Sequence, residues 1–424
     1  MTGLLTDLYE LTMAAGYFEA GKSAEWATFE LSIRRLPKNR DYVLVAGLEQ
    51  ALQYLVDLRF TGAEIAYLRS LPQFARVSAG FFDHLSELRF RGDVFAVPEG
   101  TVLFAGEPIL TVRAPIIEAQ IPETYLLSTL TFQTLIATKA SRMVRAAAGR
   151  GVVEFGTRRA HTPEAGVLGA RAAYIGGCTG TSNTLAGFRF GIPVMGTCAH
   201  SWVMSFPSEQ EAFRRLQEVL GPNTIHLVDT YDTLEGTRRA AGLGQPLWGI
   251  RLDSGDFATL SRQARAILDD AGLRDAKIMA SGDLDERSIG ELLAAGVPID
   301  AFGVGTELAT SGDAPSMGTI YKLVELGGRY TAKWSEDKAS LPGAKQVFRF
   351  ADRDVLALAD ESCPDGAEAL LRPVILSGQW FGEAPDIEAI RRRAAESVCG
   401  VRPRPVELSG ALTALVKRMR EERK

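Results

Sequence analysis

The sequence predicts an α/β protein with an irregular βα barrel and a second α+β domain built from N- and C-terminal segments. Three observations lead to this fold class. Between about residues 152 and 305, short apolar runs alternate with helical patterns, as in parallel βα units. On both sides of this region, short strands are separated by Gly and Pro turns, which is typical of small antiparallel sheets. The length of 424 residues suits more than one domain. We therefore expect residues 1–120 plus 320–424 in the α+β domain and 121–319 in the barrel.

The first segment predicts three helices and a strand ahead of a small antiparallel sheet. Thr6 is expected to cap a helix that begins at Asp7. Residues Ala27–Ile33 alternate strictly between apolar and polar, which predicts a half-buried strand. Further helices are expected at Leu48–Leu58 and Ala63–Leu71, and short strands between residues 90 and 112.

A long helix is expected next, over Glu123 to about Ala148, with Gly149 as its stop. The strands expected after it contain Val152-Val153, Pro193–Met195, Ile225–Val228, Leu247–Ile250, Lys277–Ala280 and Ile299–Phe302. Helices are expected at Ser208–Leu220, Thr233–Ala241, Phe257–Ala271 and Glu286–Ala295. Roughly six or seven consecutive units suit a barrel, and an open doubly wound sheet remains the alternative.

After about Ser311 the pattern returns to strands and ends with helices. Strands are expected at Ile320–Leu326, Arg329–Trp334, Val347–Phe350, Val355–Ala359 and Leu370–Val374, and helices at Asp386–Ala395 and Leu408–Arg423. Because the strands at both chain ends have antiparallel character, both ends are expected to contribute to the second domain.

Composition excludes several classes of function. The net charge is −5 and no basic run stands out, which argues against a nucleic-acid binder. No apolar segment reaches 18 residues, and the N-terminus lacks the basic and apolar regions of a signal peptide, so we expect a cytoplasmic protein without a membrane span. The four cysteines have neither zinc-ligand spacing nor the density of a disulfide framework.

Five predicted strands end in glycine-rich or charged clusters, which is the main functional signal. The clusters are Glu154–Arg159, Gly196–Trp202, Arg251–Asp256, Ala280–Asp283 and Gly303–Glu307. A single cluster would be only a turn. Since the carboxyl ends of parallel strands share one face, five clusters would converge there, and in a βα barrel that face holds the active site.

The residue types in these clusters indicate a site for a polyphosphorylated sugar or nucleotide. Arg158, Arg159 and Arg251 offer forked donors for phosphate or carboxylate. The glycines Gly282, Gly303 and Gly305 let backbone amides approach phosphate, and the aspartates Asp253, Asp256 and Asp283 can hold Mg²⁺ or bind sugar hydroxyls.

His200 is one of only four histidines and the one expected on this face, and histidine is the side-chain type that can change charge near neutral pH. The alternatives are a buried structural histidine or a partner for a Cys198 nucleophile, although a free cysteine usually packs as a small hydrophobe. A paired-carboxylate glycosidase would not account for three arginines and three glycine turns on one rim.

Several motifs, taken in order, resemble the nicotinate phosphoribosyltransferase family of type II phosphoribosyltransferases. They include Thr6–Met13, Phe29–Pro37, Phe132–Lys139, Glu154–Arg159, Ala172–Gly177, Gly180–Asn183, Gly196–Ser201, Arg251–Asp256 and Gly303–Thr306. The resemblance runs from residue 5 to about residue 325 and is looser beyond. It implies the barrel with a domain from both chain ends. It also implies the reaction of nicotinate with phosphoribosyl pyrophosphate to give nicotinate mononucleotide and pyrophosphate, coupled to ATP hydrolysis, in NAD salvage.

The resemblance also implies residue roles. His200 is expected to be phosphorylated transiently by ATP, and Phe155 to stack on the pyridine ring. Tyr9 would stack on the other face of that ring from a neighbouring subunit, which implies a homodimer. Arg158 and Arg251 would bind pyrophosphate or the nicotinate carboxylate.

Further implied roles concern the ribose, the metal and the substrate amide. Asp253 would bind ribose or Mg²⁺, and Gly282, Gly303 and Gly305 would hold the 5′-phosphate. Asp283 is kept as a second candidate Mg²⁺ ligand because of its residue type and its position after a predicted strand. Ser182 stands where the related nicotinamide-using enzyme carries an aspartate. A serine neither accepts a bond from an amide as a carboxylate does nor repels a carboxylate, which favours nicotinate.

Two other hypotheses remain open at this point. The first is the nicotinamide or quinolinate version of the same barrel, which a comparison of turnover with the different substrates would identify. The second is a catalytically silent barrel that senses a phosphorylated metabolite. The presence of His200, Arg251 and Asp253 together argues against the loss of catalysis.

Overall fold

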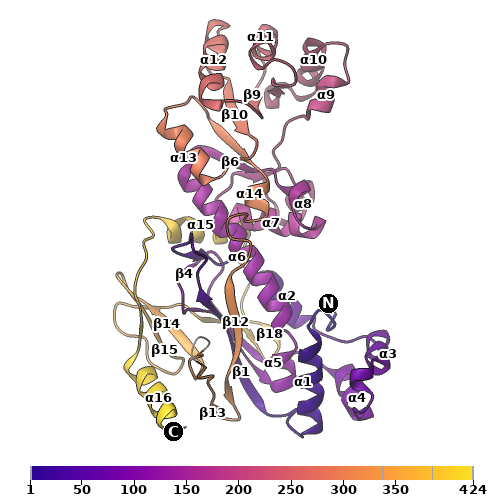
Figure 1. Ribbon diagram of the computed structural model, residues 1–424, viewed down its shortest axis with the longest axis vertical. Helices are drawn as coiled ribbons and strands as arrows, with labels where there is room; N and C mark the ends of the chain where they lie inside the picture. The colour runs from indigo at the N-terminus through magenta and orange to yellow at the C-terminus, as the bar shows by residue number, and fades with distance from the viewer. Residues whose placement is uncertain (1, 336–338, 384, 423–424) are drawn as a thin grey trace. The chain divides into compact units, whose positions relative to one another are not determined.

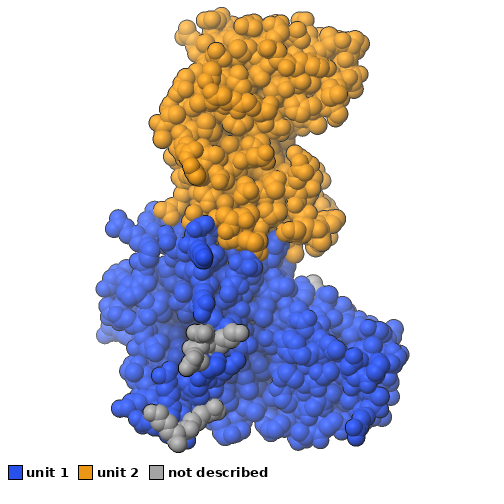
Figure 2. Space-filling model, viewed as in Figure 1, with its two compact units in different colours: residues 1–135, 316–424 blue, residues 136–315 orange. Residues whose placement is uncertain are grey.

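The computed structural model describes residues 2–335, 339–383 and 385–422. The chain forms two compact units, which are coloured separately in Figure 2. Unit 1 consists of residues 1–135 and 316–424, and unit 2 of residues 136–315. The sequence placed the first domain boundary at residue 120, ahead of the long helix α6 (Glu123–Ala146), whereas the boundary between the units falls within this helix. Leu126 and Leu130 on the first half of α6 are part of the core of unit 1.

Unit 1 contains a seven-stranded sheet with strands from both ends of the chain (Figure 1). Its strands are β1 (Trp26–Arg35), β3 (Asp93–Ala96), β5 (Pro108–Pro115), β12 (Gly318–Leu326), β13 (Arg329–Tyr330), β17 (Arg372–Leu376) and β18 (Gln379–Trp380). They run antiparallel in the order β13-β12-β1-β5-β3-β17-β18. This arrangement confirms that the N- and C-terminal segments build one α+β domain together.

Helices and a second sheet complete unit 1. The N-terminal helices are α1 (Leu8–Glu19), α2 (Leu48–Val56), α3 (Gly62–Ser70), α4 (Ala79–Glu87) and α5 (Ile116–Gln120), with β2 (Val43–Leu44) and β4 (Val102–Leu103) as a two-stranded sheet. The C-terminal part adds β14 (Lys345–Arg349), β15 (Asp354–Leu358), β16 (Glu368–Ala369), α15 (Ile387–Val398), β19 (Val406–Leu408) and α16 (Gly410–Glu421). Strand β19 pairs with β15 in parallel, so the four-stranded sheet is mixed.

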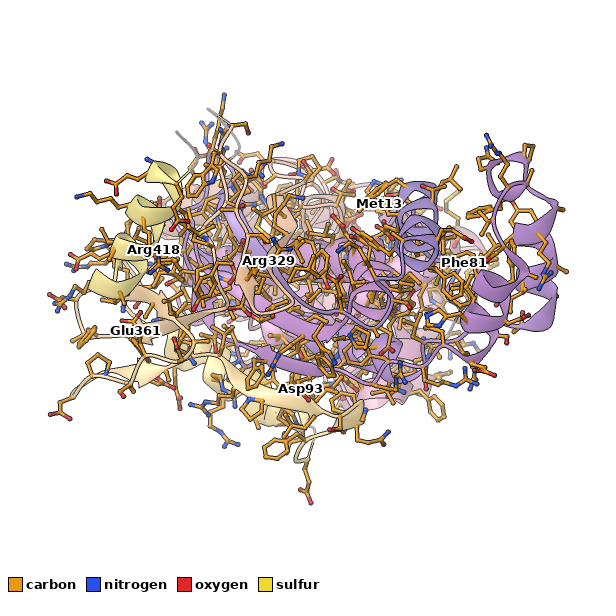
Figure 3. All side chains as sticks on the ribbon, turned by 90° about the horizontal axis from the view of Figure 1, so that it is seen from below. Met13, Phe81, Asp93, Arg329, Glu361 and Arg418 are labelled. Carbon is orange, nitrogen blue, oxygen red and sulfur yellow. The ribbon has the colours of Figure 1, made fainter. Side chains whose placement is uncertain are left out.

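Figure 3 shows unit 1 with Met13 and Phe81 towards the N-terminal helices, and Glu361 and Arg418 towards the C-terminal helix on the other side. The predicted end of the last helix at Arg423 lies outside the described residues.

Unit 2 is the predicted parallel-sheet domain. Its strands β6 (Gly151–Glu154), β7 (Gly180–Thr181), β8 (Ile225–Leu227), β9 (Gly249–Leu252), β10 (Lys277–Ser281) and β11 (Ala301–Val304) are all parallel, in the order β7-β6-β11-β10-β9-β8. Its helices are α7 (Pro163–Ile175), α8 (Thr184–Phe190), α9 (His200–Met204), α10 (Glu209–Leu220), α11 (Thr233–Leu243), α12 (Phe257–Asp270), α13 (Glu286–Ala294) and α14 (Thr306–Ala309). The strand order begins with β7 and ends with β8, and among the described residues no ladder joins these two strands, which makes the barrel irregular.

Side-chain caps show why the helices of unit 2 begin where they do. The N-cap side chains of Ser208, Asp232 and Asp285 each accept a hydrogen bond from a backbone amide in the first turn of α10, α11 and α13. Asp256 caps α12 in the same way, so this predicted metal or sugar ligand has a structural partner. Such caps satisfy amides that have no acceptor within the helix.

Three local predictions were wrong. Thr6 does not cap α1, because its hydroxyl donates to the carbonyl of Ile121, and Asp7 holds the N-cap position instead. The run Pro193–Met195 is not a buried strand: Val194 is 51% exposed and makes one isolated bridge to Thr181. Strand β1 is buried along both faces rather than half-buried, because unit 1 continues on both sides of it.

The described part of the chain contains no helix that is long and apolar enough to cross a membrane.

Candidate active site

A cavity of about 340 Å³ lies in unit 2 at the carboxyl ends of the parallel strands. It brings together six of the side chains that the sequence singled out, namely Phe155, Arg158, Ser182, His200, Arg251 and Asp253. The remaining lining residues are Gly196, Thr197, Cys198, Ala199 and Leu227. The parallel order of the sheet explains most of the convergence, since the segments with Phe155, Ser182, Arg251 and Asp253 end or follow a strand at the same edge. The segment Gly196–His200 follows the isolated bridge of Val194 to Thr181.

Arg251 on β9 organises the floor of this cavity. Its Nε donates to Ser281 Oγ at 2.7 Å, one terminal nitrogen donates to Thr197 Oγ1 at 2.8 Å, and the other lies 2.5 Å from Asp253 Oδ1. The guanidinium carbon also lies 5.7 Å from the centre of the Phe155 ring. Only 12% of the Arg251 side chain is exposed, so most of its donors are already used within the protein.

Asp253 is held in its charged form. Burial would raise the pKa of this carboxyl, but the hydrogen bond from Ser281 and the charge and hydrogen bond of Arg251 together lower the pKa below its usual value. Ser281 Oγ donates to Asp253 Oδ1 at 2.5 Å. Because both of these bonds go to Oδ1, the second oxygen, Oδ2, is the one that faces His200.

His200 has one engaged ring nitrogen and one that is not hydrogen-bonded. Nδ1 lies 3.1 Å from Thr230 Oγ1. Nε2 lies 3.7 Å from Asp253 Oδ2 and 4.0 Å from Asp229 Oδ1, both beyond hydrogen-bond distance. The side chain is 41% exposed at the first residue of α9, so the imidazole is accessible from the cavity.

Asp229 is the residue that sequence reasoning missed. Its Oδ2 accepts hydrogen bonds from the Asp253 amide at 3.0 Å and from Ser254 Oγ at 2.7 Å. Its Oδ1 is buried with no hydrogen-bond partner among the described residues, and the side chain is 1% exposed. The sequence could have indicated this residue, because Asp229 directly follows the apolar run Ile225–Val228, just as the other predicted site clusters directly follow predicted strands.

A buried carboxylate also fixes the Phe155 loop. Glu154 accepts hydrogen bonds from Thr181 Oγ1 at 2.5 Å and from the Gly156 amide, which joins β6 to β7. Burial raises the pKa of Glu154, while these two bonds and the charge of Arg158 oppose the shift. Glu154 therefore holds the backbone next to Phe155 in place without lining the cavity itself.

The predicted phosphate glycines differ in how strongly packing requires them. At Gly303 a Cβ atom would lie 2.6 Å from the Phe155 ring, and at Gly282 it would lie 2.3 Å from the Asp253 carbonyl oxygen, where φ is also +101°. Gly305 leaves more room, since a Cβ atom there would lie 3.7 Å from its nearest neighbour, the Phe155 carbonyl oxygen. Gly282 and Gly303 thus let the side chains of the cavity sit where they do.

Gly282, Gly303, Gly305 and Asp283 are not among the residues that line this cavity. Asp283 adopts a positive φ of 46°. Tyr9 belongs to unit 1, where it lies on α1 with 46% of its surface exposed.

The carboxylates of the cavity bear on the predicted metal site. Among the described residues no group of three or more His, Cys, Asp or Glu side chains is arranged to hold a metal ion. Asp229 Oδ1 and Asp253 Oδ2 nevertheless leave two carboxylate oxygens near His200 without a hydrogen bond. Mg²⁺ typically takes one or two protein carboxylates and completes its shell with water and substrate phosphate, so these two oxygens fit that ion.

The parallel-sheet fold, the arginine and aspartates on its carboxyl edge and the accessible histidine define a barrel enzyme for an anionic substrate. Comparisons with known proteins specify which one. The family model described as the nicotinate phosphoribosyltransferase N-terminal domain matches residues 4–131, and the model described as the quinolinate phosphoribosyl transferase C-terminal domain matches residues 136–314.

Relatives match over most of the chain. The nicotinate phosphoribosyltransferase pncB2 of Mycobacterium tuberculosis is 44% identical over 412 residues, covering 94% of this chain and 88% of its own. The mouse nicotinate phosphoribosyltransferase is 32% identical, covering 97% of this chain and 96% of its own. The crystal structure of the human nicotinic acid phosphoribosyltransferase superposes with a TM-score of 0.86 at 29% identity, covering 97% and 99% of the two chains. This chain belongs to the nicotinate phosphoribosyltransferase family.

Proposed function

We propose that this protein, a nicotinate phosphoribosyltransferase of NAD salvage, couples phosphoribosyl transfer to ATP through a phosphohistidine at His200. In the transfer, the pyridine nitrogen of nicotinate bonds to C1′ of phosphoribosyl pyrophosphate as the bond from C1′ to the pyrophosphate oxygen breaks. The observation that carries this proposal is the convergence of His200, Arg251, Asp253 and Phe155 in one cavity.

The geometry at His200 supports phosphorylation on Nε2. With Nδ1 as the protonated nitrogen, Nδ1–H donates to Thr230 Oγ1 and Nε2 keeps its lone pair. Nε2 then bonds to the γ-phosphorus of ATP as the bond to the ADP oxygen breaks. Water later takes the phosphoryl group and restores the histidine. Phosphohistidine adds charge and acceptor oxygens that organise neighbouring donors.

Two carboxylates face Nε2, and they would repel a phosphoryl group. Mg²⁺, when bound, supplies the positive charge that offsets this repulsion and the charge of the pyrophosphate leaving group. Asp253 through Oδ2 and Asp229 through Oδ1 would hold the ion. Asp283 was predicted from the sequence as a second ligand, but it does not line this cavity.

The remaining lining residues suit nicotinate. The Phe155 ring offers a stacking face, and Arg158 in the same lining offers a cation for the carboxylate or the pyrophosphate. Ser182 brings no negative charge against the substrate carboxylate. The loops with Gly282, Gly303 and Gly305 remain the proposed binding place of the 5′-phosphate.

A homodimer with shared active sites is part of the proposal. The first helix exposes large apolar side chains, with Leu8 44%, Tyr9 46% and Met13 39% exposed, and Leu5 just ahead of it is 48% exposed. Apolar surface of this kind favours association with another chain. Tyr9 in that surface would then reach the pyridine ring in the partner's cavity, and Tyr9→Ala would raise the KM for nicotinate.

The test measures turnover of nicotinate and of nicotinamide with and without ATP, together with acid-labile phosphate on the protein. The expected result is a preference for nicotinate, ATP stimulation and one labile phosphate per chain, which His200→Ala abolishes while slow transfer persists. Thr230→Val is the matched variant that keeps the imidazole and removes its Nδ1 partner. An unchanged ATP dependence in His200→Ala would remove the histidine from the mechanism.

A further inference from the structure

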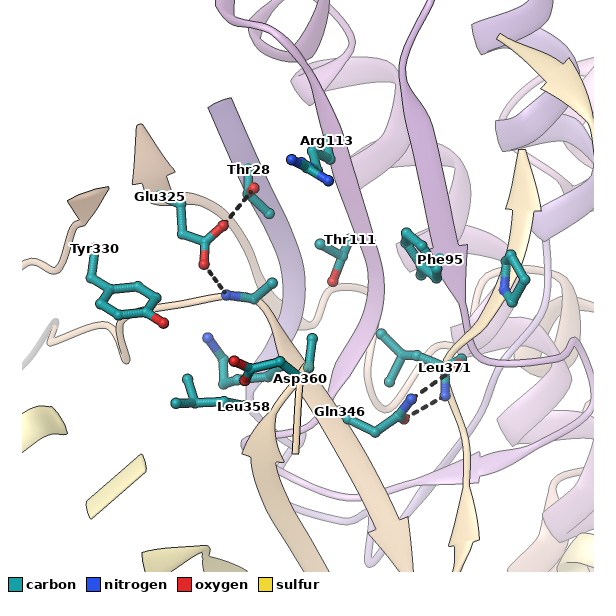
Figure 4. Close-up of a pocket in the computed structure, with 14 residues that line it drawn as sticks. Thr28, Phe95, Thr111, Arg113, Glu325, Tyr330, Gln346, Leu358, Asp360 and Leu371 are labelled. Carbon is teal, nitrogen blue, oxygen red and sulfur yellow. Dashed lines mark hydrogen bonds between the residues drawn. The ribbon is translucent and has the colours of Figure 1, made fainter. Parts of the chain in front are cut away.

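A second cavity, of about 420 Å³, lies entirely within unit 1 between the seven-stranded sheet and the β14–β15 hairpin (Figure 4). One wall is a face of the large sheet, to which Thr28, Phe95, Thr111, Arg113 and Glu325 contribute. Cross-strand register places Glu325 beside Thr28 and Thr28 beside Arg113, with Phe95 beside Thr111 in the adjoining row. The residues therefore share one surface and face one space.

The cavity holds a polar group that has no partner. Thr111 is 4% exposed, and its hydroxyl makes no hydrogen bond to any described residue. A buried hydroxyl without a partner costs about 1–3 kcal/mol, so a site that keeps one is suited to a ligand that bonds to it. Thr111 is one of the residues that line the cavity, and Figure 4 shows it between Thr28 and Phe95.

One cation of the lining is also without an acidic partner. Arg113 is an exposed residue whose guanidinium makes no ion pair or hydrogen bond with the residues that the structure describes, and its guanidinium carbon lies 5.7 Å from the centre of the Trp26 ring. Lys345, the other cation, is neutralised by Glu30 at 3.1 Å and donates to the Gly343 carbonyl at 2.8 Å. Arg113 is therefore the available anion-binding group.

The opposite side of the cavity limits the ligand to one negative charge. Glu325 lies two strands from Arg113, which corresponds to about 10 Å. It accepts hydrogen bonds from Thr28 Oγ1 at 3.0 Å and from the Ala344 amide at 3.4 Å, and Asp360 adds a second carboxylate to the lining. A ligand with anionic groups at both ends would meet these carboxylates and be repelled.

The shape and the apolar lining favour a flat ring. Phe95 and Leu371 lie on one side of Thr111, and Leu358 and Tyr330 lie on the other (Figure 4). Pro373 also lines the cavity. The cavity of about 420 Å³ has room for an aromatic ring among these side chains. A carboxylate at the end of such a ring matches the planar fork of an arginine.

We propose that this cavity is a second binding site, built by unit 1 alone, for a small aromatic monocarboxylate. The ligand carboxylate accepts hydrogen bonds from Arg113 and Thr111, and the ring lies against Phe95 and Leu371. This site does not depend on the proposed ATP coupling, so either can fail without the other.

The experiment titrates the full-length protein with 2-naphthoate and follows binding by saturation-transfer NMR. We expect a saturable site with a Kd of about 1 mM or tighter, from the ordinary affinity per atom of ligands of this size. Arg113→Met should weaken binding by about tenfold or more, and Thr111→Val by a similar factor, since each removes a bond to a charged group. Arg89→Met, an exposed arginine of the same unit outside the cavity, should leave binding unchanged.

Three further measurements separate this site from the alternatives. Phe155→Ala should leave 2-naphthoate binding intact, and 2-naphthyl phosphate, which carries more charge, should bind more weakly. Thr111→Val should not lower the melting temperature of the free protein, because it removes a buried hydroxyl that has no partner. Absence of saturable binding, binding that survives Arg113→Met, or binding lost in Phe155→Ala would each overturn the proposal.

Discussion

Replacing Arg251 by methionine tests the network that holds the active site together. The substitution removes donors to Ser281 at 2.7 Å, to Thr197 at 2.8 Å and to Asp253 at 2.5 Å. Breaking a fully buried ion pair costs about 3–5 kcal/mol, but Asp253 is 28% exposed and keeps its bond from Ser281, so we expect about 2 kcal/mol. For a unit of this size, that corresponds to a melting temperature lower by about 4–8 °C.

The same change should cost more in catalysis than in stability. Removing a positioned cation or donor from a site where charge develops typically lowers kcat by about 100- to 1000-fold. The assay is steady-state transfer to nicotinate with phosphoribosyl pyrophosphate varied, beside calorimetric unfolding. Arg238→Met is the control, because Arg238 is 58% exposed and forms a surface pair with Glu235. If Arg251→Met kept kcat/KM within about twofold of the parent at an unchanged melting temperature, the proposed role of Arg251 in holding Ser281, Thr197 and Asp253 would be wrong.

Three further predictions follow from the geometry. Lys139 is 1% exposed and pairs with Glu286 at 2.6 Å and Asp313 at 2.9 Å, so Lys139→Met should destabilise unit 2 by about 3 kcal/mol or more in calorimetric unfolding, and an unchanged melting temperature would contradict this. Burial raises the pKa of Glu10 from 4.5 to about 7, so between these pH values the folded state holds a proton that the unfolded state has lost. The free energy of unfolding should therefore fall by about 3 kcal/mol as the pH rises through this range. Urea midpoints measured against pH should show this fall, and Glu10→Gln should remove it. Ser182→Asp should lower kcat/KM for nicotinate about tenfold or more. It should also raise kcat/KM for nicotinamide relative to that for nicotinate, which parallel assays of both substrates would show.

Much of unit 2 could be predicted because most of its strands contain a short apolar run followed by a cluster of Gly, Asp or Arg. The runs at Ile225, Lys277 and Ala301 became β8, β10 and β11 with shifts of a residue or two. The run at Pro193 failed because an apolar stretch is compatible with a surface segment as well, and nothing local decides between them. Helix α4 and strand β7 were not singled out, the first because its pattern is short and the second because it is only two residues long.

The sequence by itself determined the family, the parallel-sheet domain and the edge of the sheet on which the chemistry lies. It could do so because the carboxyl ends of parallel strands meet whatever the details of packing. Only the tertiary structure decided which donor meets which acceptor. Arg251 donates hydrogen bonds to the protein's own Asp253 and Ser281. The Asp229 carboxylate lies 4.0 Å from Nε2 of His200, and Gly303 leaves room for the Phe155 ring. Those pairings depend on register and side-chain direction across strands far apart in sequence, which no local pattern specifies.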